Sequence, residues 1–267
     1  MRDNSYLDYS KLYRIKFGTI KFMLRKDVID DYWVFEGLLF ADEYYPIILK
    51  KSDVILDVGA NIGIFTCKIA PKVEHVYSIE PEPRNFELLK KNVEINEFKN
   101  VTLLNLAVSD VEETLYFENT GGTATVSKNG IAVKAKTLDS IIAELGNPKI
   151  TLLKMDIEGY EMKALSSFSK YNNLKQIILE THSKELTEQV INKLSQWGMI
   201  VRDVSRIKRL KVMKNIIIHP ISFLSIERKN KFSTVKQSLA YLIGHGKSPV
   251  ASDNEGSEQR LIYGIKN

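Results

Sequence analysis

Short apolar runs alternate with amphipathic segments from Asp53 onward, and this alternation is the main pattern along the chain. The runs are rich in Val, Ile and Leu, which is typical of strands that are covered on both faces. Strands that alternate with helices predict βα units, a parallel sheet and therefore an α/β fold class. The predicted strands are 54–58, 75–80, 101–106, 151–155 and 176–180.

Two of the amphipathic segments predict helices. Residues 83–96 place apolar side chains at helical spacing, and Pro83 lies in the first turn, where a helix tolerates proline. Residues 184–197 have the same character, and Gly198 follows them as a C-cap.

The first 50 residues and one later segment depart from the alternation. Residues 1–50 predict a β-rich extension that packs on the core, with a short Tyr-rich helix and strands at 13–17 and 20–24. Residues 114–119 and 131–136 predict a β-hairpin.

The segment 206–247 is strongly cationic, because it holds ten Lys or Arg residues and a single acid, Glu227. The chain as a whole has 38 Lys and Arg against 33 Asp and Glu, so its net charge is only +5. A basic insert predicts an anionic partner such as RNA or an acidic lipid surface. The alternative is that its apolar residues pack on the domain and leave the cations in solvent.

The predicted organisation has four parts. They are the extension at 1–50, the core at 51–205, the basic insert at 206–247, and a loose loop with a final strand at 248–267. A chain of 267 residues is long enough for one substantial α/β domain with such additions.

Several classes of protein are excluded by what the chain lacks. Cys67 is the single cysteine, which excludes an internal disulfide framework and a cysteine-based zinc site, and we expect it to be a buried small residue. The first residues lack the apolar stretch of a secretory signal, and no run reaches the roughly 18 apolar residues of a membrane span. We therefore expect a cytoplasmic protein, with a peripheral position at the inner membrane surface if the basic insert binds lipid.

A glycine-rich turn follows the first predicted core strand. Residues 57–63 read D-x-G-x-N-x-G, and Gly59 and Gly63 allow backbone to approach a ligand and a helix to pack closely. Glu80 ends the next strand, where a carboxylate can accept hydrogen bonds from both hydroxyls of a ribose. Asp57 would repel a pyrophosphate but suits ammonium and sulfonium charges, so the motif predicts S-adenosylmethionine as cofactor. The alternative is that both glycines serve only the turn.

The loop after the third predicted strand begins with Leu106 and Ala107. In a doubly wound sheet this loop lies across the same crevice as the glycine turn. It either binds adenine through backbone amides and apolar contact or is an ordinary connection.

The segment 154–161 reads K-M-D-I-E-G-Y-E, and L-E-T-H follows at 179–182. Together with L-D-V-G-A-N-I-G at 56–63 and T-L-D-S at 137–140, these motifs resemble the FkbM-type methyltransferase family. The resemblance implies a Rossmann-like class I methyltransferase fold, with helices on both faces of a seven-stranded, mostly parallel sheet and one antiparallel strand near the end. It also implies methyl transfer from S-adenosylmethionine, usually to a hydroxyl of a sugar or a sugar-bearing metabolite.

Carried over by position, the resemblance assigns site residues. The cofactor residues are Asp57, Gly59, Ala60, Asn61, Gly63 and Glu80, with Leu106, Ala107 and Asp156 as further contacts. Asp156 and Glu158 would line the crevice at the end of the fourth core strand.

A hydroxyl acceptor must lose a proton, and Asp156, Glu158 and His182 are candidates for the base because they follow predicted strands. Each has another interpretation. Asp156 would cap a helix that begins near Glu158 or hold the methionine ammonium, Glu158 would favour that helix N-terminus, and His182 would be structural. The Asp156–Glu158 pair supplies only two metal ligands, so no metal is predicted.

The sequence therefore predicts an O-methyltransferase that acts on a sugar, glycolipid or sugar-containing metabolite. An RNA methyltransferase that binds phosphates through residues 206–247 is the alternative enzyme. A non-catalytic module that binds the cofactor and docks on anionic surfaces is the alternative outside enzymes.

Overall fold

The structure, a computed structural model, describes residues 7–40, 42–119, 124–127, 130–204, 218–219 and 259–266. Nearly all of the basic insert at 206–247 and the loop at 248–258 lie outside these residues, so the predictions made for them stay predictions. Within the described residues, no helix combines the length and the apolar character that crossing a membrane requires.

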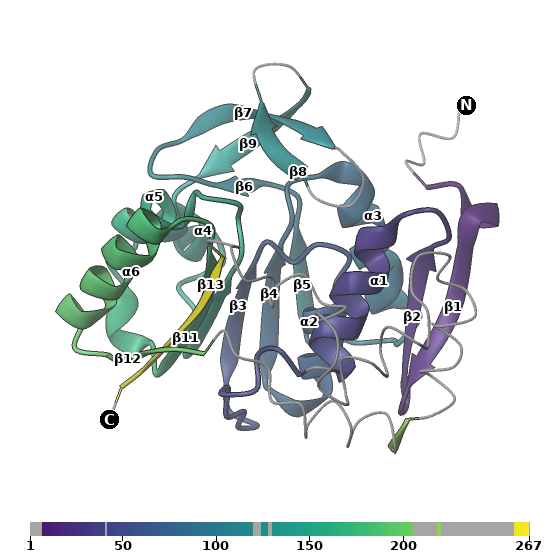
Figure 1. The fold of residues 1–267 in the computed structure, drawn as a ribbon, viewed down its shortest axis with the longest axis horizontal. Coiled ribbons are helices and arrows are strands. Elements are labelled where there is room, and N and C mark those ends of the chain that lie inside the picture. Colours follow the sequence, from purple (N-terminus) through teal and green to yellow (C-terminus); the bar gives the residue numbers. More distant parts are fainter. Residues whose placement is uncertain are drawn as a thin grey trace, which may run out of the picture.

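A seven-stranded sheet with the order β12-β13-β11-β10-β3-β4-β5 forms the centre of the molecule (Figure 1). Its strands are β3 (Val54–Val58), β4 (His75–Ile79), β5 (Val101–Leu104), β10 (Leu152–Met155), β11 (Gln176–Thr181), β12 (Ile200–Asp203) and β13 (Arg260–Ile265). Neighbours from β5 to β11 pair in parallel, whereas β13 runs antiparallel to both β11 and β12. This arrangement confirms the predicted fold class. Strand β12 was not predicted, since most of its residues are exposed and give no apolar run.

Side chains that alternate along each strand build two hydrophobic clusters, one on each face of the sheet. Ile55 lies in the cluster with helices α1 to α3, and Leu56 and Val58 lie in the cluster with α4 to α6. The helices are α1 (Ile29–Phe35), α2 (Ile64–Ile69), α3 (Pro83–Glu94), α4 (Leu138–Glu144), α5 (Glu161–Ser166) and α6 (Lys184–Gln196). Gly198 follows α6 in the left-handed region at φ +74°, as its predicted C-cap role requires.

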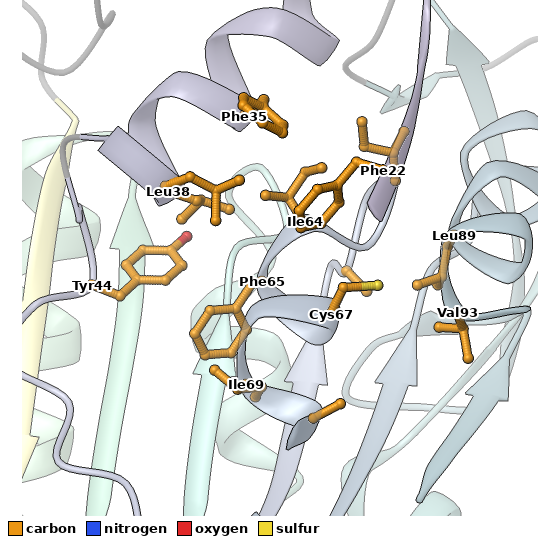
Figure 2. Close-up of a cluster of buried hydrophobic side chains, with 14 of the residues drawn as sticks. Phe22, Phe35, Leu38, Tyr44, Ile64, Phe65, Cys67, Ile69, Leu89 and Val93 are labelled. Carbon is orange, nitrogen blue, oxygen red and sulfur yellow. The ribbon is translucent and has the colours of Figure 1, made fainter. Parts of the chain in front are cut away.

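The extension contributes an antiparallel hairpin and a helix to the first of these clusters. The hairpin pairs β1 (Leu12–Phe17) with β2 (Ile20–Arg25), and the ring of Phe22 meets that of Phe35 edge-on at 5.4 Å. Figure 2 shows α2 in this cluster, with Tyr44 on one side of it and Leu89 and Val93 of α3 on the other. Helix α1 was not predicted. Short helical turns are Tyr9–Lys11, Glu36–Phe40, Ala70–Lys72 and Tyr171–Asn173.

Polar contacts also tie the extension to the core. The backbone N–H of Met23 donates to Oδ1 of Asn92 on α3 at 2.6 Å, and Nδ2 of Asn92 donates to the carbonyl of Ile62 at 2.8 Å. Arg25 donates to Asp31 on α1 and to Asn85 on α3. One face of α3 therefore joins the extension to the glycine turn.

A second, four-stranded sheet with the order β6-β9-β7-β8 lies beyond the carboxyl ends of β3, β4 and β5 (Figure 1). Its strands are β6 (Ala107–Val108), β7 (Glu113–Asn119), β8 (Ala124–Ser127) and β9 (Ile131–Lys136). The predicted pairing of 114–119 with 131–136 is confirmed as β7 and β9. The prediction of a simple hairpin is wrong, because the connection contains β8, which pairs with the other edge of β7.

Candidate active site

The turn between β3 and α2 is held to its neighbours by backbone hydrogen bonds. The N–H groups of Gly59 and Ala60 both donate to the carbonyl of Ile79 at 2.9 Å. Gly59 has φ +76°, and a Cβ at this position would lie 1.8 Å from the carbonyl oxygen of Asp156. Only glycine therefore lets the turn approach the end of β10 this closely.

Gly63 meets a different requirement. It has φ +84° at the N-cap of α2, and an added Cβ would lie 2.5 Å from Cδ1 of Leu89 on α3. Neither pocket described below includes Gly63 among its lining residues. Gly63 therefore serves helix packing here, and its predicted contact with the cofactor stays a prediction.

Asp57 is fully buried and forms an ion pair with Lys154, its register partner on β10. Its Oδ1 lies 3.3 Å from Lys154 Nζ, and its Oδ2 accepts a hydrogen bond from Thr66 at 2.6 Å. Burial lowers the pKa of Lys154, but the charges of Asp57 and Asp156 outweigh burial and raise it. Asp57 is not among the lining residues of the two pockets described below, and its predicted role toward the cofactor stays a prediction.

The Asp57–Lys154 pair instead supports the glycine turn. Nζ of Lys154 donates a hydrogen bond to the carbonyl oxygen of Gly59 at 2.6 Å. A buried lysine between a carboxylate and a backbone carbonyl fixes the direction in which the turn leaves the strand.

Glu80 directly follows β4 and is buried. Its Oε2 accepts a hydrogen bond from the N–H of Asn61 at 2.8 Å, and its Oε1 accepts one from the N–H of Glu82 at 3.0 Å. Burial raises the pKa of Glu80 to about 7, although these two backbone donors oppose the rise. Each carboxyl oxygen keeps a second lone pair, so Glu80 can also accept hydrogen bonds from a ligand.

One pocket lies between the strand ends and the small sheet, and we name it the apolar pocket. Its apolar lining consists of Val58, Ile79, Pro81, Leu106, Ala107, Val108, Leu115, Phe117, Val126 and Ile157. Its remaining lining residues are Gly59, Asn61, Glu80, Asn85, Asp156, Glu158 and Tyr160. Leu106 and Ala107 are thus part of this lining, and their contact with adenine stays a prediction.

A second pocket, which we name the acidic pocket, opens on the α1 side of the turn and has a volume of about 250 Å³. Its charged lining residues are Asp30, Glu43, Lys154, Asp156, Glu158 and Glu180. The others are Trp33, Val34, Leu38, Tyr44, Gly59, Ala60, Asn61, Phe65 and Gln259. Gly59, Asn61, Asp156 and Glu158 line both pockets.

Crowded carboxylates dominate the electrostatics of the acidic pocket. Burial, with Asp156 and Glu43 nearby, raises the pKa of Glu180 well above its ordinary range. Burial and Asp156 also raise the pKa of Glu158 to about 7. Lys154 is the one cation among the described lining residues, and it already pairs with Asp57. The pocket is therefore strongly acidic.

The three predicted base candidates lie together at the edge of the acidic pocket. His182 Nε2 is 3.2 Å from Glu158 Oε2 and 3.9 Å from Asp156 Oδ1. On its other side, Nδ1 of His182 lies 3.7 Å from Oε1 of Glu161. Asp156 caps no helix, because α5 begins only at Glu161, so that alternative interpretation is wrong. Glu158 likewise lies outside the helix, at φ +54°.

Sequence reasoning assigned no role to Lys154, Glu161 or Glu180. A signal was present, because Lys154 and Glu161 belong to the K-x-D-x-E-G-Y-E motif and Glu180 belongs to L-E-T-H. The period of two along neighbouring strands also places Lys154 and Glu180 on the face of Asp57. The α1 residues in the acidic pocket had no such signal, because α1 was not predicted.

The strand order, the glycine turn after the first core strand and the buried acid after the second define a class I methyltransferase. The sequence model of the Methyltransferase FkbM domain matches residues 57–201, which is more than half of the chain. The chain belongs to the FkbM methyltransferase family.

Individual relatives are more distant. The chain is 25% identical over 190 residues to the hexuronic acid methyltransferase AglP of Haloferax volcanii, a match that covers 68% of this chain and 78% of AglP. It is 29% identical over 128 residues to a probable cobalt-precorrin-6B C(15)-methyltransferase (decarboxylating) of Methanocaldococcus jannaschii, covering 46% of this chain and 70% of that protein.

Among solved structures, the methyltransferase FkbM from Methylobacillus flagellatus is similar, with a TM-score of 0.48 and 19% identity. The match covers 66% of this chain and 46% of that one, so the chain spans about half the length of this structural relative.

Proposed function

We propose that this methyltransferase binds S-adenosylmethionine in the apolar pocket and methylates a hydroxyl of a sugar, glycolipid or sugar-containing metabolite in the acidic pocket. The observation that carries the proposal is the wall the two pockets share, made of Gly59, Asn61, Asp156 and Glu158. Two ligands that fill the pockets meet at this wall. Such a junction is what a direct transfer between two substrates requires.

The residues of the apolar pocket fit this cofactor. Apolar side chains on both sides, including Leu106 and Phe117, suit the faces of an adenine ring. Glu80 offers carboxyl lone pairs to the two hydroxyls of a ribose, while its backbone donors hold it in place. When bound, S-adenosylmethionine supplies a methyl group on a positively charged sulfur.

The chain's own contribution is to align the acceptor and to take its proton. The shared wall fixes where the two ligands approach, and orientation supplies much of the rate acceleration in a displacement. Asp156 and Glu158 belong to that wall, and His182 contacts both of them. We assign proton removal to this group, with Asp156 contacting both ligands.

Two observations support a sugar acceptor over the RNA alternative. The similarity to AglP, whose name gives a hexuronic acid as substrate, supports a sugar. Lys154 is the one cation among the described residues that line the acidic pocket, and it already pairs with Asp57, so this lining does not favour the phosphates of a nucleic acid. A binding role of the basic insert at 206–247 toward a lipid or RNA surface remains a separate prediction.

The test is methyl transfer to a panel of hydroxyl-bearing sugars and sugar lipids, followed as S-adenosylhomocysteine formation. A cell extract, with and without RNase, provides the RNA arm. Asp156→Asn should lower turnover by about 10²-fold or more while cofactor affinity changes only a few-fold. Glu185→Gln, on the first turn of α6, is the matched control and should change neither quantity.

Wild-type turnover in Asp156→Asn would remove Asp156 from the reaction. Absence of cofactor binding in the folded wild-type protein would contradict the proposal as a whole. If RNase abolishes product formation, the acceptor is RNA and not a sugar.

A further inference from the structure

We propose that Asp156, Glu158 and His182 hold a divalent transition-metal ion at the edge of the acidic pocket. The inference rests on the proposed function only for what the ion does, because the site itself is argued from the geometry of these side chains. The prediction of no metal counted only the two carboxylates. The fold adds His182, which follows β11, as a third ligand.

The ligand atoms are arranged as an ion would need them. One oxygen from each carboxylate and one imidazole nitrogen all lie within 4.8 Å of one another. Two ligand atoms about 2.1 Å from one ion, at angles of about 90–110°, are about 3.0–3.4 Å apart. The 3.2 Å between His182 Nε2 and Glu158 Oε2 falls in this range, and the 3.9 Å to Asp156 Oδ1 needs a small side-chain movement.

A second observation comes from Glu161, behind the histidine. Its side chain is fully buried, its Oε2 has no hydrogen-bond partner, and its Oε1 lies 3.7 Å from His182 Nδ1. The N–H groups of Ile157 and Gly159 donate to the same Oε1 and fix the carboxylate against the imidazole. A carboxylate behind the free nitrogen of a histidine is the usual support of a metal-ligating imidazole.

The orientation of the His182 ring is the next feature that fits a bound ion. His182 directs one ring nitrogen at Glu161 and the other at Glu158 and Asp156. A neutral imidazole carries one N–H, so one of its nitrogens must turn a lone pair toward carboxylate oxygen. An ion on Nε2 fits this arrangement, because Nδ1 would then be the N–H that faces Glu161 Oε1 at 3.7 Å, and all three ligands would contribute electron pairs to the metal.

The surrounding charge favours the same occupant. Lys154 is the one cation among the described residues that line the pocket, and it is already paired with Asp57. A divalent cation lowers the net negative charge of the pocket. It would also bind an acceptor oxygen beside the shared wall and make its proton easier to remove, and the carboxylate oxygen of Asp156 or Glu158 that does not hold the ion would take that proton.

The donor set selects the class of ion. Imidazole nitrogen suits transition metals, whereas magnesium and calcium prefer oxygen ligands alone. Two carboxylates and one imidazole leave positions open for acceptor oxygens or water. We therefore take Mn²⁺ as the probe, with Zn²⁺ as a second ion and Mg²⁺ as the comparison.

The experiment uses the full chain, stripped of metal with a chelator and returned to chelator-free buffer without cofactor. Mn²⁺ binding is followed by electron paramagnetic resonance, and Zn²⁺ and Mg²⁺ binding by calorimetry. We expect one Mn²⁺ per chain and weaker Mg²⁺ binding. His182→Ala and Glu158→Gln should each lower Mn²⁺ affinity at least about 10-fold, and Glu161→Gln should lower it about 10- to 100-fold.

Glu43→Gln is the matched control, because it removes the same charge from the same pocket outside the ligand set. It should change Mn²⁺ affinity less than about 3-fold. Mn²⁺ should also broaden the proton resonances of the His182 ring strongly. It should affect those of His75 much less, because His75 lies at the amino end of β4 and the site lies beyond the carboxyl ends of the strands. Glu158 is partly exposed, so its variant keeps the test valid if the buried Glu161 variant fails to fold.

Absence of Mn²⁺ and Zn²⁺ binding would overturn the inference. An equal loss of Mn²⁺ affinity in Glu43→Gln would also overturn the inference, because the ion would then be attracted by the overall charge of the pocket and not by specific ligands. Methyl transfer that proceeds unchanged in chelator, with no ion bound, would overturn the role of the ion in transfer and leave the proposed function intact. Binding of one ion per chain, without cofactor binding or methyl transfer, would support the metal site and contradict the proposed function.

Discussion

Glu80 should make the stability of this protein depend on pH in a predictable direction. Burial raises the pKa of Glu80 to about 7, from an ordinary value of 4.5. Between these two values the folded state keeps a proton that the unfolded state has lost. The stabilising contribution of the protonated carboxyl is therefore complete below about pH 4.5 and is lost as the pH rises toward 7.

The size of the effect follows from the two pKa values. The difference between about 7 and 4.5 corresponds to about 3 kcal/mol of unfolding free energy, of which about 2–3 kcal/mol is lost between pH 5 and pH 8. Glu80→Gln cannot ionise, so it should lack this loss. Relative to the wild type, the variant should gain about 2–3 kcal/mol of stability between pH 5 and pH 8.

Urea unfolding at both pH values, without ligand, measures the difference directly. Other carboxyls with a raised pKa, such as Glu158, affect wild type and variant alike and cancel in the comparison. Glu94→Gln, on an exposed side chain, is the control and should stay within about 0.5 kcal/mol of wild type at both pH values. Parallel pH profiles for wild type and Glu80→Gln would refute the reasoning.

Four further outcomes are expected. Glu80→Gln should weaken S-adenosylmethionine binding by about 1–3 kcal/mol in calorimetry, and unchanged affinity would remove Glu80 from the cofactor site. Gly59→Ala places a Cβ 1.8 Å from the carbonyl oxygen of Asp156 and should lower the free energy of unfolding by about 3 kcal/mol or more. Gly146→Ala, which has open space around the added Cβ at φ +83°, should lower it by only about 1 kcal/mol. Similar urea midpoints for the two variants would contradict this prediction. Lys154→Met leaves a buried carboxylate without its cation and should cost about 3–5 kcal/mol, so a wild-type melting curve would speak against the ion pair. Cys67 is fully buried with a raised pKa, and it should react with a thiol reagent only at the rate of unfolding.

Much of the central fold could be predicted from the local pattern of apolar and polar residues in the sequence. The apolar runs predicted β3, β4, β5, β10 and β11 because strands covered on both faces need apolar residues at almost every position. The glycine turn was also visible in the sequence, since glycine adopts positive φ, as Gly59 and Gly63 do, more readily than other residues. The burial of Cys67 was also predicted correctly.

Elements that depend on distant partners were missed. Strand β12 has mostly exposed residues and exists because β13, from the far end of the chain, pairs with it. Helix α1 buries Asp31, which reads as a surface residue until Arg25 of β2 is placed beside it. Strand β8 has only β7 as its partner within the described residues.

The chemistry of the site divides in the same way. Sequence alone located the residue types, namely Glu80 after one strand, Asp156 and Glu158 after another, and His182 after a third. Only the tertiary structure decided their surroundings, because the residues that set charge and burial come from separate strands and helices. It paired Asp57 with Lys154, and it placed Glu161 behind His182. Spacing along a strand fixes which face a side chain takes, but only the packing of several strands decides which charges meet there.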